Sequence, residues 1–207
     1  MSVNKEIFEI VIVGHPGHSH SVIETITTNG KYTLMGYFDK IEKKGLNTLP
    51  YLGEETSETK GYNIFVTIGE NKTRKVIYEK LATENNLGFS IIDKSANIAD
   101  TTRVSSKQCF IAKNVIINSK SEISKGCIIN TGVIVEHDCN IGQFSHIAPG
   151  AVLCGNVRVG ENTLIGANST ILPNITIGDN VTVGAGSVVT KNIPSNSIYM
   201  GNPAKPI

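Results

Sequence analysis

The second half of the chain carries an aliphatic residue at every sixth position. Steps of six residues from Ile117 to Val189 meet only Ile, Val or Leu, thirteen times in succession. A period of six fits neither an α-helix nor a strand that alternates between two faces, and it is the repeat of a parallel β-helix. Each hexapeptide then forms one short strand and one corner, and three hexapeptides complete one triangular coil.

The corners of this repeat are predicted three residues after each aliphatic position, where Gly, Asn and Asp tolerate the positive φ of a tight corner. From Ile123 onward the predicted corner residues are Gly126, Gly132, Asp138, Phe144, Gly150, Asn156, Asn162, Asn168, Asn174, Asn180, Gly186 and Asn192. Phe144 alone departs from these residue types, and such departures often mark function or strain. The next position mostly holds a small side chain that fits a narrow interior, so we interpret Cys127 and Cys139 as packing residues.

The same spacing continues upstream from Ile116 to Ile92 in a register shifted by one residue. We therefore expect an irregularity near Ile116–Ile117. The β-helix itself is expected to run from about 92 to 193, in between five and six coils. The second domain is accordingly predicted to span residues 91–207, with a short C-terminal tail.

Residues 1–90 follow a different pattern, in which apolar strands alternate with amphipathic helices. Strands are predicted at 9–13, 32–38 and 64–68, and helices at 19–28 and 72–82. Strand–turn–helix repetition predicts an α/β domain with a small parallel, Rossmann-like sheet. Ligands of such sheets bind at the carboxyl ends of the strands, where this chain carries residues 14–18, Asp39 and residues 69–71.

Composition narrows the classes of partner. The net charge of the 207 residues is +1, which argues against electrostatic binding of long nucleic acids. No apolar run is long enough to cross a membrane, so no membrane insertion is expected. The four cysteines lack CxxC spacing, which indicates neither a zinc site nor a redox pair. We interpret them as reduced thiols of a cytoplasmic protein, and no bound metal is expected.

Three segments together resemble one known family. Residues 12–18, residues 133–146 with their Glu-His-Asp motif and second histidine, and residues 201–205 are similar to the bacterial hexapeptide-repeat sugar acyltransferases. These include nucleotide-sugar 4-amino N-acetyltransferases and sialic acid O-acetyltransferases. The resemblance covers nearly the whole chain and implies a left-handed β-helix. It also implies a homotrimer that binds acetyl-CoA between neighbouring β-helices.

Acetyl transfer to an amine needs a base, and an imidazole suits that role because its ordinary pKa lies near physiological pH. The β-helix holds two histidines, His137 and His146. The resemblance implies that His137 is the base and that Asp138 orients it, with Glu136 as the competing partner. Gly155 follows His137 by one coil, so its lack of a side chain is expected to leave room beside the base.

The resemblance also implies the binding residues. His146 and Gly155 are expected near the thioester arm of acetyl-CoA, and backbone near Ala167 and Ala185 along the rest of the coenzyme. Glycines in the turn between a strand and a helix favour the binding of a phosphate group at the start of that helix. The residues expected to bind the sugar nucleotide are Gly14, Pro16, Gly17, His18, Phe38, Asp39 and Gly69.

The leading prediction is an acetyl-CoA-dependent N-acetyltransferase that acts on a nucleotide-linked 4-amino-4,6-dideoxyhexose. A sialic acid O-acetyltransferase is the close alternative, and a non-catalytic β-helix scaffold is a distant one. A zinc carbonic anhydrase on the same fold would need three histidine ligands, and this β-helix offers two. The sequence leaves open which nucleotide base and which sugar are bound.

Overall fold

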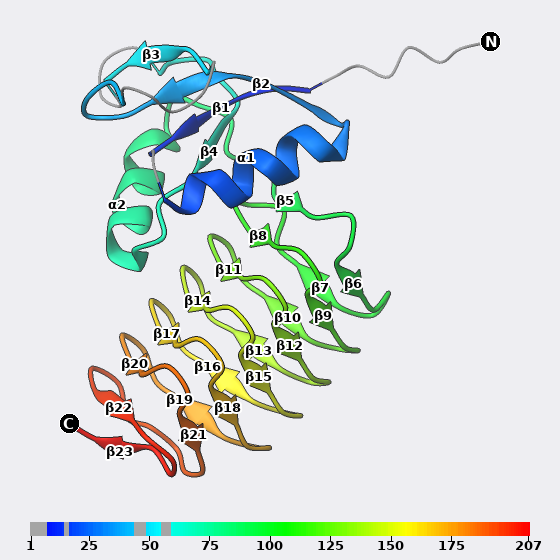
Figure 1. Ribbon diagram of the computed structural model, residues 1–207, viewed down its shortest axis with the longest axis vertical. Helices are drawn as coiled ribbons and strands as arrows, with labels where there is room; N and C mark the ends of the chain where they lie inside the picture. Colours follow the sequence, from blue (N-terminus) through cyan, green and yellow to red (C-terminus); the bar gives the residue numbers. More distant parts are fainter. Residues whose placement is uncertain (1–7, 15–16, 44–48, 55–58) are drawn as a thin grey trace.

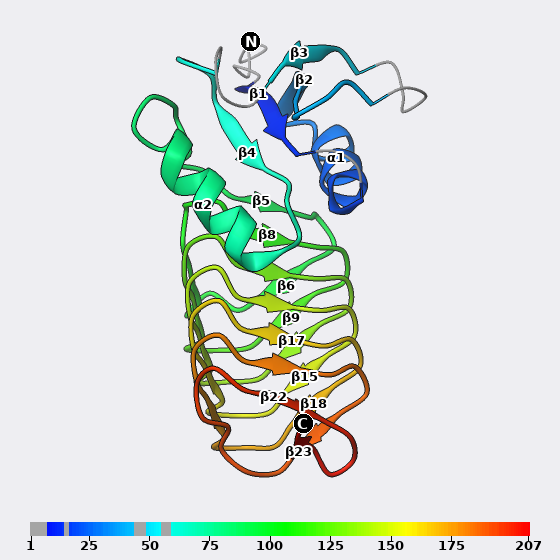
Figure 2. The same ribbon diagram turned by 90° about the vertical axis from the view of Figure 1, so that its left-hand side faces the viewer.

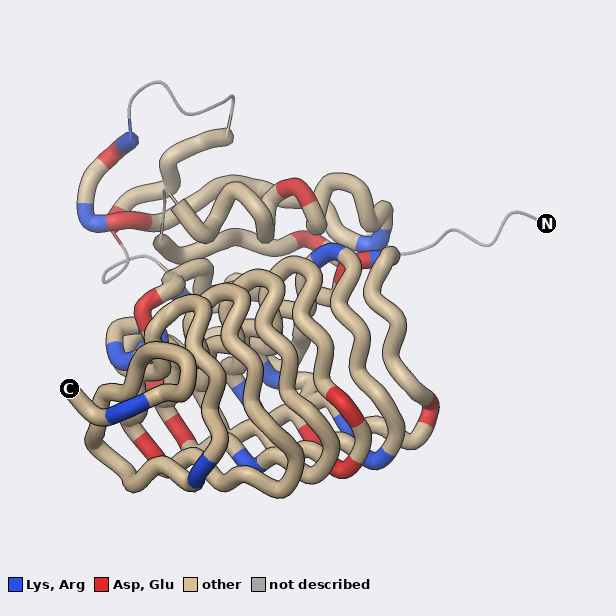
Figure 3. Tube along the Cα trace, turned by 60° about the horizontal axis from the view of Figure 1, so that its bottom comes forward, with Lys and Arg blue, Asp and Glu red and all other residues tan. Residues whose placement is uncertain are grey.

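The computed structural model describes residues 8–14, 17–43, 49–54 and 59–207. Figures 1 and 2 show an α/β layer seated on the first coils of a long β-helix, whose coils stack toward the C-terminus. The predicted fold class, a small parallel sheet followed by a parallel β-helix, is confirmed. In Figure 3, charged residues of both signs are scattered over the two parts.

The front part contains a four-stranded parallel sheet in the order β3-β2-β1-β4. The sequence pattern did not predict β3, because a strand of three half-buried residues has too little alternation to register. The elements are β1 (Phe8–Val13), α1 (His18–Asn29), β2 (Tyr32–Phe38), β3 (Tyr51–Gly53), β4 (Ile64–Val66) and α2 (Asn71–Leu81). The strand predicted at 64–68 thus ends two residues early.

The β-helix has three faces, and the chain visits an eight-stranded, a six-stranded and a five-stranded sheet in turn. The eight-stranded face comprises β5 (Ile91–Ile92), β8 (Phe110–Ile111), β11 (Ile128–Ile129), β14 (His146–Ile147), β17 (Leu164–Ile165), β20 (Thr182–Val183), β22 (Ile198–Met200) and β23 (Lys205–Pro206). The antiparallel pair β22–β23 closes the last coil.

Two further faces complete the triangle. The six-stranded face comprises β6 (Asn97–Ile98), β9 (Ile116–Ile117), β12 (Ile134–Val135), β15 (Val152–Leu153), β18 (Thr170–Ile171) and β21 (Val188–Val189). The five-stranded face comprises β7 (Arg103–Val104), β10 (Glu122–Ile123), β13 (Asn140–Ile141), β16 (Arg158–Val159) and β19 (Thr176–Ile177). From β8 to β21, the second residue of each two-residue strand is buried and forms the core.

The corner rule is confirmed with one exception. Every predicted corner residue from Gly126 to Gly186 has a positive φ, including Phe144 at 56°. Asn192 is not among the positive-φ residues, and Asn196 takes a φ of 60° instead. The prediction for Asn192 was wrong because the last turn leaves the regular repeat. The interior thiols Cys127 and Cys139 are buried as expected, and burial raises the pKa of both.

The register shift lies earlier than expected. Val104 pairs with Ile123, whereas Ile111 pairs with Ile129, so the extra residue falls in the turn between β7 and β8 and not near Ile116–Ile117. That turn carries Gln108 toward the front sheet. Its amide accepts from Val66 N at 2.9 Å and donates to the Ile64 carbonyl at 2.7 Å. Because of this irregularity, the Gln108 side chain forms hydrogen bonds with backbone groups at the open edge of β4, as a neighbouring strand would.

Candidate active site

The carboxyl ends of the front strands converge, as parallel pairing requires. Gly14 N donates to the Phe38 carbonyl at 3.0 Å, and Thr67 N donates to the Val13 carbonyl at 2.8 Å. Gly14 has a φ of 95°, and a Cβ there would lie 2.6 Å from Ile68 Cγ1. Only glycine fits this close approach. The strand-end residues Gly14, Asp39 and Gly69 thus lie around one end of the sheet.

The two helices differ at their N-termini. The N-cap of α2 is Glu70, whose carboxylate accepts from Lys72 N at 3.0 Å and Thr73 N at 2.7 Å. The N-cap of α1 is Gly17, with a φ of 92° and no side-chain cap. An internal anion therefore already occupies the positive end of α2, while α1 presents its end without one. Pro16 lies outside the described residues.

Phe38 and Asp39 follow each other at the end of β2. The Phe38 ring is buried against Tyr62, at 5.7 Å between ring centroids, so Phe38 presents backbone and not side chain to the strand ends. The Asp39 side chain is 11% exposed, and its carboxylate accepts from Lys40 N at 2.7 Å and lies 3.6 Å from Lys43 Nζ. These contacts fix the orientation of the carboxylate at the end of β2.

His18 brings the front part against the eight-stranded face. Its ring lies edge-on to Phe110 at 5.2 Å and 6.2 Å from the ring of His146, both between centroids. The backbone at Gly69 passes close by, because a Cβ there would lie 3.5 Å from His18 Cβ. The structure therefore brings His146 together with the predicted front residues His18 and Gly69.

Both of these histidines are held neutral. Burial, the neighbouring His146 and the Arg74 guanidinium lower the pKa of His18 to about 3. Burial and Arg74 lower the pKa of His146 to about 4, against a hydrogen bond to the Gly69 backbone that raises it. The Asn130 amide nitrogen lies 3.1 Å from His146 Nε2. Uncharged imidazoles here supply a hydrogen-bond donor and an acceptor without a charge.

A cavity of about 310 Å³ opens beside His146, between the start of α2 and the eight-stranded face. Outward-facing residues of β14, β17 and β20 line one wall, and the first turn of α2 lines the other. The lining residues are Gly69, Glu70, Asn71, Lys72, His146, Asn162, Leu164, Asn180 and Thr182. We call this cavity, which lies between the front part and the β-helix surface, the front pocket.

His137 occupies the corner between the six-stranded and five-stranded faces. Its Nδ1 lies 2.8 Å from Asp138 Oδ2, and the two side chains are 59% and 48% exposed. Asp138 has a φ of 61°, so one residue serves as corner and as carboxylate partner. A carboxylate in this position fixes the orientation of the ring through Nδ1, which leaves Nε2 as the nitrogen that can accept a proton.

Gly155 lies directly against this imidazole. A Cβ at Gly155 would lie 2.6 Å from His137 Cε1 and 2.7 Å from Nε2. The crowding expected from the spacing of one coil is therefore confirmed. Because Gly155 has no positive φ, the position is glycine for space beside the ring and not for backbone conformation.

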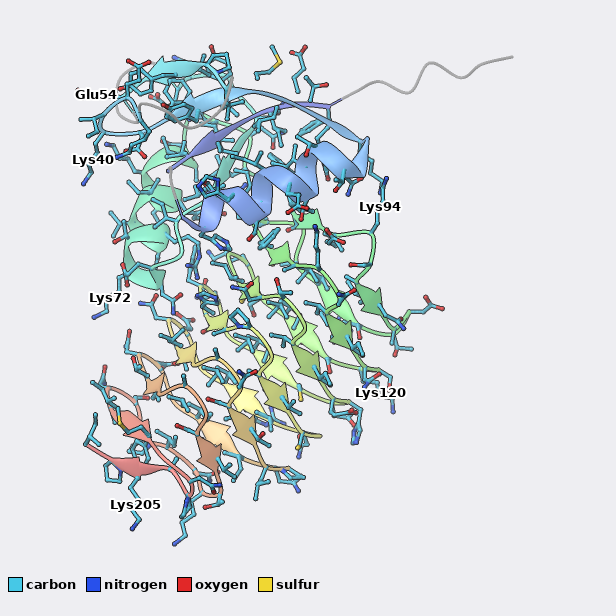
Figure 4. The ribbon with its side chains drawn as sticks, viewed as in Figure 1. Lys40, Glu54, Lys72, Lys94, Lys120 and Lys205 are labelled. Atoms are coloured by element: carbon cyan, nitrogen blue, oxygen red, sulfur yellow. The ribbon has the colours of Figure 1, made fainter. Side chains whose placement is uncertain are left out.

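Ala167 and Ala185 stack at a different corner, between the eight-stranded and six-stranded faces, where Gly186 N donates to the Ala167 carbonyl at 2.8 Å. The expected site residues therefore fall into three groups: the front pocket with His146, the His137 corner with Gly155, and this alanine corner. In a triangular coil the His137 corner is opposite the eight-stranded face. Figure 4 agrees, with Lys72 at the cavity wall and Lys120, one coil from Asp138, on opposite sides of the coils.

Two residues of this region escaped the sequence analysis. Asn130 follows a regular strand, and Arg74 has the appearance of a solvent-facing residue of an amphipathic helix. No local pattern distinguishes them, because their partners come from other segments. Within the described part of the chain, no cluster of three or more His, Cys, Asp or Glu could hold a metal ion, and no helix is long and apolar enough to cross a membrane.

Two family models match the chain in order. The model described as PglD N-terminal domain matches residues 9–81, and the model described as Bacterial transferase hexapeptide (six repeats) matches residues 156–191. Among curated protein sequences, none matches closely enough to count as a relative.

Solved structures extend the similarity over the whole chain. PerB from Caulobacter crescentus, solved with CoA and GDP-perosamine, is 32% identical, with a TM-score of 0.89 over 97% of this chain and 98% of that one. The acetyltransferase domain of PglB from Neisseria gonorrhoeae, solved with acetyl coenzyme A, is 29% identical, with a TM-score of 0.89 over 96% and 98%. WeeI from Acinetobacter baumannii, at 22% identity and a TM-score of 0.86 over 96% and 100%, shares the fold. The chain belongs to the bacterial hexapeptide-repeat sugar acyltransferases.

Proposed function

We propose that the protein transfers an acetyl group from acetyl-CoA to the 4-amino group of a nucleotide-linked 4-amino-4,6-dideoxyhexose. The observation that carries this proposal is the His137–Asp138 pair held over Gly155. The Caulobacter crescentus relative, solved with CoA and GDP-perosamine, supports the same substrate classes. Reduced thiols and the use of acetyl-CoA fit a cytoplasmic enzyme.

The chemistry is a direct transfer. The amine nitrogen attacks the thioester carbonyl carbon, and His137 Nε2 takes the proton from that nitrogen. The C–S bond then breaks, and the imidazolium returns the proton to the leaving sulfur, so CoA departs as its thiol. Asp138 holds Nδ1–H and stabilises the imidazolium as it forms. The backbone N–H of Gly155 donates to the developing oxyanion. No covalent enzyme intermediate is needed.

The active form is a homotrimer in this proposal. His137 is opposite the face that carries the front pocket, so a neighbouring copy brings its own His137 to that pocket. The six-stranded face supplies a surface for such contact, since its outward residues Ile116, Ile134 and Val152 are apolar and partly exposed. Apolar strips of this kind are typical of subunit interfaces.

The function is tested by acetyl transfer assays with acetyl-CoA and UDP-, dTDP- and GDP-linked 4-amino sugars. One of these should be acetylated at nitrogen, as mass spectrometry would show. Transfer to a sialic acid hydroxyl in place of an amine would overturn the substrate assignment. If calorimetry detected no binding of acetyl-CoA, the non-catalytic scaffold would be the remaining alternative. Sedimentation equilibrium should give a trimer. An active monomer at micromolar concentration would contradict the shared site.

The two parts divide the work. We infer that Asp39 binds the nucleotide part of the substrate. Asp39→Ala should therefore raise KM for the sugar nucleotide and leave KM for acetyl-CoA nearly unchanged. Lys40→Ala, which removes an exposed neighbour, is the matched control. Equal effects on both substrates would refute the division.

A further inference from the structure

Arg74 on α2 is buried, at 2% exposure, although it carries a charge. All five of its N–H bonds have acceptors. Nη1 donates to the carbonyls of Ile68 at 3.1 Å and Gly69 at 2.9 Å, and Nη2 donates to Asn71 Oδ1 at 2.8 Å. These three acceptors belong to the segment from the end of β4 to the start of α2, which forms one wall of the front pocket.

The other contacts of Arg74 reach the β-helix. Nε donates to the Gly126 carbonyl at 2.9 Å, and Nη2 donates to the Phe144 carbonyl at 2.8 Å. Gly126 and Phe144 are successive corners before the eight-stranded face, and Phe144 is two residues from His146. One guanidinium thus joins the loop that carries Gly69 to the corner that leads into the strand of His146.

Phe144 is explained by the same junction. Its ring packs against Tyr78 of α2 at 5.3 Å between centroids and fills the space where a Cβ at Gly126 would lie. Asn71 adds a third tie, from Nδ2 to the Thr163 carbonyl at 3.2 Å in the next corner. The departure from the corner rule at Phe144 therefore seats α2 on the β-helix.

Charge distinguishes this junction from ordinary packing. Within the described residues no ion pair joins Arg74 to a carboxylate; burial lowers its pKa to about 10, so the side chain stays protonated at neutral pH. A buried cation without a paired anion is costly. The charged groups facing His18 and His146 are each other and Arg74, with Glu70 and Lys72 on the same cavity wall.

We propose that Arg74 is a positioning residue, which sets the sugar-nucleotide pocket against the β-helix face that carries His146. This inference rests on the proposed function for its link to catalysis. Each substrate keeps its own binding surface when Arg74 is altered, but their mutual placement is lost. A displacement of about 1 Å between reacting groups costs on the order of a hundredfold in rate.

The test compares Arg74→Met, Arg74→Lys and the control Lys80→Met, which removes an exposed cation from the last turn of α2. We expect kcat to fall roughly a hundredfold in Arg74→Met and tenfold in Arg74→Lys. The Kd of each substrate, measured separately by calorimetry, should change less than about threefold. Lys80→Met should match the wild type. If Arg74→Met does not fold, Asn71→Ala can replace it, because this change removes one Arg74 acceptor and one β-helix contact. It should also lower kcat and leave both Kd values nearly unchanged, with a smaller fall in kcat.

A second readout needs no turnover. Proton NMR titration should show the His18 and His146 imidazoles protonating at higher pH in Arg74→Met than in Arg74→Lys or the wild type. A folded Arg74→Met variant whose titrations and kcat are both unchanged would overturn the inference. So would a rise in Kd for one substrate as large as the fall in kcat, because Arg74 would then act on binding and not on placement. If the wild-type protein acetylates no sugar nucleotide, the proposed function is wrong. The NMR titrations of His18 and His146 then still test whether Arg74 sets the environment of the two imidazoles.

Discussion

Two histidine sites of this molecule use the same side chain under opposite conditions. At the corner between the six-stranded and five-stranded faces, His137 is exposed and lies 2.8 Å from a carboxylate. At the junction of the two parts, His18 and His146 are largely buried and face a guanidinium, which with burial lowers their pKa values to about 3 and 4. The carboxylate fixes the orientation of the ring at the first site, while burial and the cation keep the imidazoles of the second site uncharged.

This difference between the two histidine sites suggests different roles, proton transfer at His137 and placement of the substrates at His18 and His146. In the proposed mechanism His137 accepts a proton, and its exposed ring and its contact with Asp138 suit that role. Neutral imidazoles keep one donor and one acceptor at fixed positions over the whole working pH range. We therefore expect substitutions of His137 and Asp138 to act mainly on kcat, and substitutions of His146 to act on coenzyme binding and acid stability.

The largest effect should come from His137→Asn. Asparagine tolerates a corner, so the fold should survive, while the loss of the base should lower kcat by roughly a hundredfold to ten-thousandfold. The matched change at the junction, His146→Asn, should instead raise KM for acetyl-CoA. Steady-state kinetics on both variants checks the contrast. If His137→Asn keeps more than about a tenth of wild-type kcat, general base catalysis by this residue is wrong.

Gly155→Val should have the next largest effect. The added Cβ would lie within 2.7 Å of His137 Nε2, so the exposed ring must swing away from Asp138. We expect kcat to fall by about tenfold to a hundredfold and KM for acetyl-CoA to rise, with the melting temperature nearly unchanged. Gly132→Asn serves as the control, because it adds a side chain where there is open space and asparagine already occupies other corners with a positive φ. A folded Gly155→Val enzyme with normal kcat and KM would remove Gly155 from the site.

Asp138→Asn should lower kcat by about tenfold, because an amide no longer stabilises the imidazolium but still fits the corner. Glu136→Gln tests the competing partner and should change kcat less than about twofold, since Asp138 makes the observed contact. A larger loss from Glu136→Gln than from Asp138→Asn would reverse the assignment of the orienting group.

The smallest effect concerns acid stability of the junction. His18 and His146 have lowered pKa values in the folded state, so between about pH 4 and pH 6.5 the unfolded chain binds more protons. Stability should therefore fall as pH drops below about 6.5. The loss should be roughly 1 kcal/mol per histidine at pH 5.5, a few degrees in melting temperature. Calorimetry at pH 7.5 and 5.5 checks this, and His146→Asn should flatten the slope. A melting temperature that does not change over this range would contradict the buried neutral state.

Much of the fold was predictable, because its determinants repeat locally. The six-residue period identified the β-helix, and residue types at the corners predicted positive φ through Gly186. The register shift was misplaced, since its cause is Gln108 reaching the edge of β4, a segment over forty residues away. Asn192 was misassigned because the closing turn is shaped by the end of the solenoid. The short β3 escaped because it has too few residues to show alternation.

The sequence by itself determined the repeat, the order of the two parts and the proximity of His137, Asp138 and Gly155, because chain neighbours and an 18-residue coil are both local relations. Only the tertiary structure decided what α2 contacts. The contacts of Arg74 with Gly126 and Phe144 join segments whose separation in sequence follows no period. Such contacts depend on how the front part seats on the coils, and the same seating buries His18 and His146 beside a cation and so decides their charge.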